Sequence, residues 1–323
     1  MTKKDGTIII ATRSSELALH QARLVQSLLA KHGAVSELKT YKTVGDKRLD
    51  EPLASIGAKG LFTQELEADL AAGRVDCCVH SLKDLPTESP DGLDLGALLT
   101  REDPRDVLVV NHITEATSLD DLPRGSRVGT SSLRRRAQLL AVRPDLDVVE
   151  LRGNVPTRVR KVDGGNVHAA ILAAAGIHRL GISQHITAYL EPPRWLPAAG
   201  QGAIAVQIRG DDEAMRKLLA PLHDAETEMQ VTAERSFLGA LEGGCQVPIG
   251  ALAMTPLDGG RAMLHGFIAD VQGRRVLRGE GEIDRANPAE SGRELARQLR
   301  ARGALDILDG LRRAVAVPSP QPE

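Results

Sequence analysis

The sequence predicts an α/β protein of two similar lobes with a cleft between them, followed by a smaller α+β domain. Over the first 210 of its 323 residues, short apolar runs alternate with helical stretches, which indicates sheets rich in parallel strands. Two segments of that region repeat one pattern of strand, polar turn and helix. The last hundred residues change to a long helix, two alternating β stretches and a C-terminal helix.

The apolar runs and helical patterns place the elements in order. Strands are expected at 7–11, 37–43, 75–80, 106–110, 127–129, 148–151, 169–173 and 203–208, with helices at 15–31, 64–72 and 132–141. In the last third we expect a helix at 224–241, β stretches at 262–271 and 275–283, and a helix at 289–314.

Composition excludes several classes of protein. Aromatic residues make up 2% of the chain, which argues against a surface that stacks nucleic-acid bases, and the net charge is −2. No apolar run approaches the ~20 residues of a membrane span. The three cysteines do not make a disulfide framework, and the nine histidines lack metal-binding spacing. We therefore expect a reduced, cytoplasmic protein without a metal, a membrane or a nucleic-acid partner.

Positive charge is concentrated in the middle of the chain. Between Pro123 and Arg194 there are eleven arginines and one lysine against five acidic residues. Arg134, Arg135 and Arg136 fall in the first turns of a helix, where positive charge opposes the helix dipole. An anionic ligand would explain them, whereas a solvated basic face is the plainer alternative. The serines that begin this helix and the first one are equally explained as N-caps.

Polar residues follow several predicted strands, where open α/β sheets bind ligands. Lys83 and Asp84 come after strand 75–80, as an anion contact and an acid/base or charge-stabilising group, and an ordinary surface turn explains them equally well. Arginines stand in similar places elsewhere, and together they predict a polyanion in the cleft. They are Arg13, Arg152, Arg158 and Arg179.

Cys245 lies in a glycine-rich loop after helix 224–241, where its backbone can approach a ligand. The negative end of the helix disfavours a thiolate there, which weakens a cysteine-protease interpretation. Cys77 and Cys78 lie within a strand and are expected in the core. The polar, glycine-containing stretch 45–62 is either a lid beside the cleft or disordered.

Nine segments in one order, between residues 11 and 251, resemble the porphobilinogen deaminase (hydroxymethylbilane synthase) family. They are ATRSS, GAKGLFTQELE, VHSLKDLPT, REDPRD, VGTSSLRRRAQL, LRGNVPTR, AGIHRLG, LPAAGQGA and LEGGCQVPIGA. The resemblance implies a transferase of tetrapyrrole and haem biosynthesis. Such an enzyme joins four porphobilinogen molecules head to tail with loss of ammonia, on a dipyrromethane primer, and water then releases hydroxymethylbilane.

The resemblance also implies a fold and a set of site residues. It implies two lobes like those of periplasmic binding proteins, at 1–102 with 203–222 and at 106–197, a third domain at 225–317 and a disordered tail at 318–323. The primer is implied to be joined by a thioether to Cys245, and Asp84 to be catalytic. Residues implied to hold the primer are Ser81, Lys83, Asp84, Thr130, Ser131, Arg134, Arg135, Arg152 and Gly153. Those implied to bind substrate carboxylates are Arg13, Ser15, Arg152, Arg158, Arg179 and Gln201, with Lys59 and Phe62 in a lid.

The resemblance fits the residue chemistry, because every pyrrole unit carries two carboxylates and arginine grips carboxylates with paired hydrogen bonds. Loss of ammonia leaves a cationic electrophile, which a carboxylate at Asp84 would stabilise. The chain departs from the family pattern at Ser55, Ala58 and His168. The family suggests a monomer. A two-lobed solute-binding protein without chemistry, and a nucleic-acid-binding module, are the rival interpretations.

Overall fold

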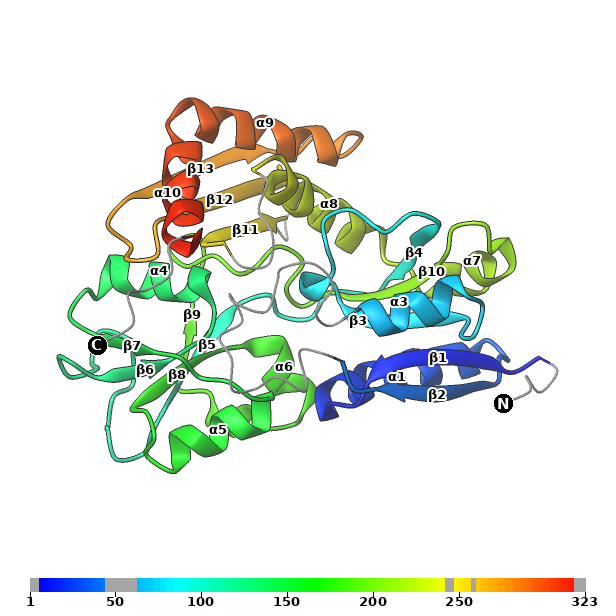
Figure 1. Ribbon diagram of the computed structural model, residues 1–323, viewed down its shortest axis with the longest axis horizontal. Helices are drawn as coiled ribbons and strands as arrows, with labels where there is room; N and C mark the ends of the chain where they lie inside the picture. The colour runs from blue at the N-terminus through cyan, green and yellow to red at the C-terminus, as the bar shows by residue number, and fades with distance from the viewer. Residues whose placement is uncertain (1–5, 44–62, 242–246, 257–259, 317–323) are drawn as a thin grey trace.

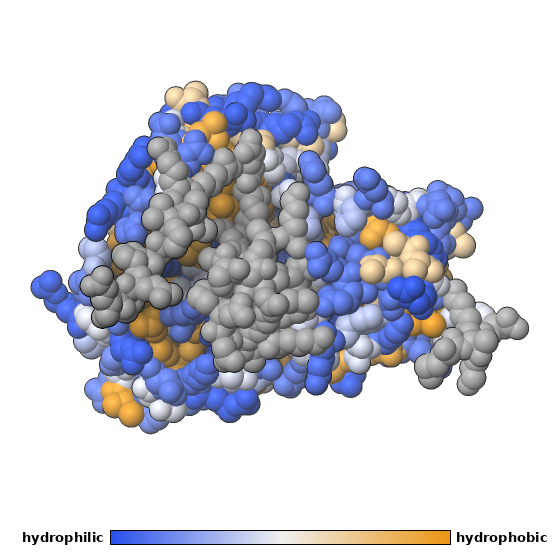
Figure 2. All heavy atoms as spheres, viewed as in Figure 1, coloured by the Kyte–Doolittle hydropathy of each residue, from blue (hydrophilic) through white to orange (hydrophobic). Residues whose placement is uncertain are grey.

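The computed structural model describes residues 6–43, 63–241, 247–256 and 260–316. Three β-sheets organise these residues into two lobes and a third domain (Figure 1). The face seen in Figure 2 is mostly hydrophilic, with apolar residues in small, separate groups. The predicted fold class of two α/β lobes and a small α+β domain is confirmed by these sheets and their helices.

The first lobe is built on a five-stranded sheet in the order β2-β1-β3-β10-β4. Its strands are β1 (Ile8–Arg13), β2 (Ser36–Tyr41), β3 (Cys77–Ser81), β4 (Leu93–Leu98) and β10 (Ile204–Arg209). Helices α1 (Glu16–Lys31) and α3 (Gln64–Ala71) cover opposite faces, since α1 packs against Ile10 and Cys77 whereas α3 packs against the alternating residues Ala11 and Cys78. The expected burial of both cysteines is confirmed. Helix α7 (Glu213–Leu219), the turn η4 (Ala220–Leu222) and the turn η2 (Leu82–Asp84) complete the lobe.

The second lobe repeats this plan, with a sheet in the order β7-β6-β8-β5-β9. Its strands are β5 (Asp106–Val110), β6 (Arg127–Gly129), β7 (Asp147–Val149), β8 (Ala169–Ala173) and β9 (Ala188–Leu190). One face packs on α4 (Leu133–Val142), and the other on α5 (Val155–Asp163) and α6 (Ala174–Arg179). A short turn, η3 (Ser183–His185), leads towards β9.

In each sheet four strands share one direction and the fourth in order is reversed. β10 is antiparallel to β3 and β4, and β5 is antiparallel to β8 and β9. Each reversed strand is the first one after the chain crosses from the other lobe, through residues 99–105 or 191–203. The amino-terminal ends of β5 and β10 therefore lie at the same sheet edges as the carboxyl ends of their neighbours.

The third domain packs two long helices on a three-stranded antiparallel sheet in the order β11-β12-β13. Its elements are α8 (Ala225–Ala240), β11 (Ile249–Met254), β12 (Met263–Ala269), β13 (Val276–Glu282), α9 (Pro288–Ala301) and α10 (Ala304–Ala316). The single helix predicted at 289–314 is wrong, because Gly303 adopts a left-handed φ of +92° and separates α9 from α10. Strand β11 was not among the predicted elements.

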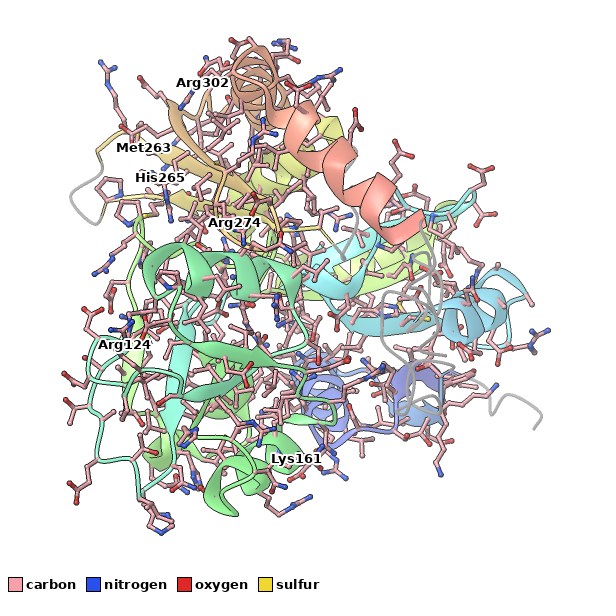
Figure 3. The ribbon with its side chains drawn as sticks, turned by 60° about the vertical axis from the view of Figure 1, so that its left-hand side comes forward. Arg124, Lys161, Met263, His265, Arg274 and Arg302 are labelled. Atoms are coloured by element: carbon pink, nitrogen blue, oxygen red, sulfur yellow. The ribbon has the colours of Figure 1, made fainter. Side chains whose placement is uncertain are left out.

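The third domain contacts both lobes. The turn between β12 and β13 lies against α4 so closely that a Cβ on Gly273 would be 2.4 Å from the carbonyl oxygen of Ala137. In Figure 3 the neighbouring Arg274 lies at this junction, whereas Arg302 lies at the far end of the domain. On the other side, Val231 of α8 joins a buried apolar cluster with Leu82 and Leu85 of the first lobe. The domain thus bridges the two lobes.

Candidate functional site

Most of the predicted site residues meet where the two sheets face each other. In the first lobe, Arg13 ends β1, Ser81 ends β3 and Gln201 precedes β10. In the second lobe, Arg152 follows β7 and Arg179 ends α6 after β8. Because these sheet edges carry strand ends of both directions, residues far apart in sequence come together there.

The first cavity lies within the first lobe and contains the carboxylate of Asp84. Arg13, Ser15, His80 and Ser81 also line it. Arg13 Nη1 lies 4.0 Å from Asp84 Oδ2, a distance for charge attraction beyond a direct hydrogen bond, and the Asp84 side chain is 36% exposed. A carboxylate is thus presented at the cavity wall with a guanidinium beside it.

The position of Asp84 follows from the residues on either side of it. β3 ends at Ser81, and the turn η2 follows directly. Leu82 is fully buried and Leu85 is 5% exposed, whereas Lys83 and Asp84 between them are half-buried. The two leucines anchor the turn in the apolar interior, so its polar residues are held at the cavities by a rigid backbone.

The second cavity adjoins the first and has walls from both lobes. Leu17, Gln21 and Ser81 line both cavities. The other polar residues of its lining come from the turn after β3, from three helices of the second lobe and from the second crossing segment. They are Lys83, Arg135, Arg158, Arg179 and Gln201. Lys83 Nζ donates a hydrogen bond to Gln201 Oε1 at 3.3 Å, so the turn η2 is tied to the second crossing segment.

Several positively charged side chains around the second cavity favour binding of an anion there. Burial, followed by the charge of Arg135, lowers the pKa of Lys83 to about 8. Burial, then the charges of Arg135 and Arg152, lowers the pKa of Arg158 to about 10. Several cations are therefore held together at a cost in free energy, which a bound carboxylate would relieve. Arg158 donates one hydrogen bond to the carbonyl of Gly153, and Arg179 donates one to the carbonyl of Gly202.

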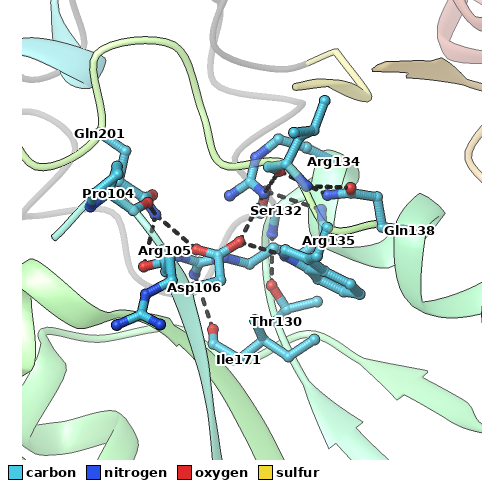
Figure 4. A network of polar contacts seen from close by, with 12 residues as sticks. Pro104, Arg105, Asp106, Thr130, Ser132, Arg134, Arg135, Gln138, Ile171 and Gln201 are labelled. Carbon is cyan, nitrogen blue, oxygen red and sulfur yellow. Dashed lines mark hydrogen bonds and ion pairs between the residues drawn. The ribbon is translucent and has the colours of Figure 1, made fainter. Parts of the chain in front are cut away.

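Asp106, the first residue of β5, is the centre of a buried polar network (Figure 4). Its carboxylate accepts hydrogen bonds from Arg134 Nη1 and Arg135 Nη2, both at 2.7 Å. Trp195 Nε1 and Gln201 Nε2 donate to it at 2.8 Å. Burial alone would raise the pKa of Asp106, but the two guanidinium groups outweigh burial and lower it. Asp106 thus connects the arginines of α4 with both crossing segments.

This network corrects one argument from the sequence. The inference that an anionic ligand is needed to explain the arginines in the first turns of α4 is wrong for Arg134 and Arg135. Asp106 supplies an anion for these two from within the protein. Arg134 is 4% exposed and also bonds to the carbonyl of Leu196, and Arg136 bonds to the carbonyl of Val148. Only Arg135 of the three lines one of the two cavities.

Four further predicted residues lie outside the linings of these cavities, although within the described chain. Ser131 Oγ donates to the carbonyl of Leu151, and Thr130 Oγ1 accepts from the amide of Ser132. Arg152 and Gly153 follow β7. The carbonyl of Gly153 accepts from Arg158, and its φ of +114° is one that favours glycine.

The serines that begin α1 and α4 are N-caps, one of the two explanations that the sequence allowed. Ser15 Oγ accepts from the amide of Ala18, and Ser132 Oγ accepts from the amide of Arg135. Ser15 also lines the first cavity, so capping and ligand contact are compatible at that residue.

Several predicted residues lie outside the described residues: Cys245, Lys59, Phe62, Ser55, Ala58 and the tail 318–323. The predictions for a lid at 45–62 fall there too. His168 is described and lies just before β8, at the end of that strand away from the cleft. Its Nδ1 accepts from the amide of Arg127, so this departure from the family pattern has a structural role.

Sequence reasoning missed Asp106, Gln21 and His80. Asp106 stands in the segment REDPRD, but the rule that ligands bind at the carboxyl ends of strands overlooks the start of an antiparallel strand. Gln21 faces the cavities one turn into α1 and exchanges hydrogen bonds with Ser81. His80 is 5% exposed, and burial lowers its pKa to about 4, so it is neutral at pH 7.

The described residues hold neither a cluster of metal ligands nor a membrane-spanning helix. No group of three or more metal-ligating side chains occurs within them. Among their helices, none is long and apolar enough to cross a membrane.

Comparison with known proteins gives one consistent result. Residues 8–217 match the family model "Porphobilinogen deaminase, dipyromethane cofactor binding domain", and residues 229–301 match "Porphobilinogen deaminase, C-terminal domain". A porphobilinogen deaminase of Syntrophobacter fumaroxidans is 47% identical over 96% of this chain and 99% of its own. Another, of Nitratidesulfovibrio vulgaris strain DP4, is 50% identical over 94% and 96%.

Solved structures resemble the chain more distantly. A nutrient binding protein from Burkholderia cenocepacia matches with a TM-score of 0.44 and 15% identity, over 68% of this chain and 93% of that one. The periplasmic VFT2 domain of Bordetella pertussis BvgS matches with a TM-score of 0.43 and 18% identity, over 69% and 90%. On the two family models and the near-full-length relatives, the chain belongs to the porphobilinogen deaminase family.

Proposed function

We propose that the two adjoining cavities are the site at which this chain performs the reaction of its family. That reaction joins four porphobilinogen molecules head to tail onto a dipyrromethane primer, releases ammonia at each addition, and ends with hydrolysis to hydroxymethylbilane. The enzyme is a transferase of tetrapyrrole biosynthesis. The observation that carries the proposal is the convergence of Lys83, Arg158 and Arg179 on one cavity beside Asp84.

The charge of the site fits the primer. Each ring of a dipyrromethane carries two carboxylates, and the cations around the second cavity are held close together and partly desolvated. Bidentate contacts from arginine suit such carboxylates. We assign the primer to Cys245 by a thioether, with Ser81, Lys83, Asp84, Thr130, Ser131, Arg134, Arg135, Arg152 and Gly153 around it. When bound, the primer supplies the terminal pyrrole ring to which substrate is joined.

A second set of residues is assigned to the substrate. Arg13, Ser15, Arg152, Arg158, Arg179 and Gln201 hold the acetate and propionate of the incoming pyrrole. Because Arg13 ends a strand, Arg158 and Arg179 belong to helices and Gln201 belongs to a crossing segment, most of these contacts come from ordered elements that orient the ring. Lys59 and Phe62 are assigned to a lid.

Asp84 acts on the reacting centre. As ammonia leaves the aminomethyl group of the substrate, positive charge develops on the pyrrole. The Asp84 carboxylate lies at the cavity wall, where it stabilises that charge. Arg13, 4.0 Å away, attracts the carboxylate electrostatically.

Intact mass spectrometry tests this function. The purified protein is expected to exceed its sequence mass by one dipyrromethane, and Cys245→Ser to lack the increment. With porphobilinogen, the wild-type protein should pass through species one to four units heavier and release product. An unmodified mass with no turnover would favour a solute-binding protein that shares the two lobes. Binding of nucleic acid without turnover would favour a nucleic-acid-binding module.

The remaining assignments rest on composition and on the buried thiols. Cys77 and Cys78 are free and buried, which suits a reducing compartment such as the cytoplasm. The chain acts as a monomer with porphobilinogen as its partner, and it uses no metal, membrane or nucleic acid. Sedimentation of the holoenzyme checks the monomer directly.

A further inference from the structure

One arginine of the third domain holds the segment that follows Asp84. Arg235 lies in the last two turns of α8. Its guanidinium donates hydrogen bonds to three consecutive carbonyls, those of Leu85 at 3.4 Å, Pro86 at 2.5 Å and Thr87 at 3.1 Å. These carbonyls belong to the segment just after the turn η2, outside any helix or strand. A single planar group thus fixes three successive peptide units.

The contact continues along α8 on both sides of Arg235. One turn earlier, Val231 packs in the same buried cluster as Leu82 and Leu85, the residues that flank Lys83 and Asp84. One turn later, a Cβ on Gly239 would lie 3.6 Å from the side chain of Thr87. Three successive turns of α8 therefore contact the chain on both sides of Asp84.

The same helix precedes Cys245 in the sequence. α8 ends at Ala240, five residues before the cysteine. One helix thus contacts the turn η2 and precedes, in the sequence, the attachment point assigned to the growing chain. Because guanidinium donors grip carbonyls directionally, a shift of the turn relative to α8 breaks these hydrogen bonds.

We propose that Arg235 is a positioning residue for chain elongation: it holds the Asp84 turn in a fixed relation to α8, the helix that precedes Cys245 in the sequence. The proposal rests on the proposed function of Asp84. Asp84 serves every addition, so Arg235 acts equally on all four. It does not touch substrate, and the cations that bind carboxylates are contributed by other elements.

The test compares Arg235→Leu and Arg235→Lys with a matched control. Arg278 of β13 also anchors the third domain through two consecutive carbonyls, of Pro193 and Arg194, on the side of the second lobe. Arg278→Leu therefore removes a docking contact of the same kind away from Asp84. Each holoenzyme is checked for primer mass and melting temperature, then assayed for kcat, KM and the rates of the four single additions by mass spectrometry.

Arg235→Leu is expected to retain the primer and to lower kcat by about 10- to 100-fold, with all four additions slowed alike and KM changed less than about threefold. Arg235→Lys should recover part of kcat, because an ammonium still donates to these carbonyls. Arg278→Leu should lower only the melting temperature. Equal loss of kcat in Arg235→Leu and Arg278→Leu, wild-type kcat in Arg235→Leu, or loss of the primer would each overturn the proposal. If Arg235→Leu does not fold, Arg235→Lys decides. A wild-type kcat at a lowered melting temperature in that variant would show that Arg235 only docks the third domain, and this too would overturn the proposal. Absence of turnover in the wild type would instead refute the proposed function.

Discussion

Arg101 and Glu234 form a buried, bidentate ion pair, with Nη1–Oε1 at 2.6 Å and Nη2–Oε2 at 3.0 Å. Arg101 belongs to the first crossing segment and Glu234 to α8. The same carboxylate accepts from the amides of Gly200 and Ala253, at 2.7 and 2.8 Å. One side chain therefore joins both crossing segments to the third domain, next to Arg235 in sequence.

Glu234→Gln is expected to destabilise the protein by ~3–5 kcal/mol, because it leaves the Arg101 guanidinium buried without a counter-ion. Urea unfolding monitored by circular dichroism measures the change. Glu290→Gln is the control, since Glu290 pairs with Arg293 and Arg297 at the surface, where water screens the charges and the loss of stability should be much smaller. Equal effects of the two substitutions would show that the buried pair is not a structural junction.

Asp106 should govern stability in acid. Its pKa is lowered in the folded state, so its contribution is complete above the unfolded value of 3.8 and is lost as pH falls below it. Below about pH 4, the free energy of unfolding of the wild type should therefore fall by ~1.4 kcal/mol per pH unit more steeply than that of Asp106→Asn. Above pH 5 the two curves should run parallel. Urea titrations between pH 3 and 7 measure both slopes, and parallel curves throughout would contradict this account.

Lys83, assigned to the primer, lines the same cavity as Arg158 and Arg179, so loss of its charge in alkali should also weaken binding of the substrate carboxylates. Its pKa is lowered to about 8 by burial, so the ammonium loses its proton as pH rises through that value and no longer attracts a carboxylate. KM for porphobilinogen is expected to rise above pH 8 in the wild type. In Lys83→Arg the guanidinium stays charged, and the rise should move to higher pH. Steady-state assays from pH 6.5 to 9.5 decide, and superimposable profiles would remove Lys83 from substrate binding.

Local patterns predicted much of the fold. The helix at 15–31 and the strand at 106–110 follow from periodicity and apolar runs, and both lie where expected. Short strands such as β4 and β9 have no comparable signal, because their pairing with β10 and β5 is set by long-range contacts. The break at Gly303 depends on a backbone angle that a helical pattern of side chains does not record.

The candidate site was predictable in its residue types but less so in its partners. The segments carrying Arg13, Asp84 and Arg179 do converge on adjoining cavities. That Arg134 and Arg135 both pair with Asp106 depends on the reversal of β5, which places its first residue at the cleft edge. Likewise, the grip of Arg235 on the Asp84 turn joins residues about 150 positions apart and leaves no local trace.

The most direct test of the account is whether the carboxylate of Asp84 drives chain growth. Asp84→Asn keeps the shape of the side chain and removes its charge. The control is Asp94→Asn, in the same lobe, where an exposed carboxylate pairs with Arg216. Purified holoenzymes are mixed with porphobilinogen and their intact masses are followed with time. We expect Asp84→Asn to carry the primer but gain almost no pyrrole units, while Asp94→Asn gains them at the wild-type rate. Addition of pyrrole units by Asp84→Asn at the wild-type rate would contradict the account.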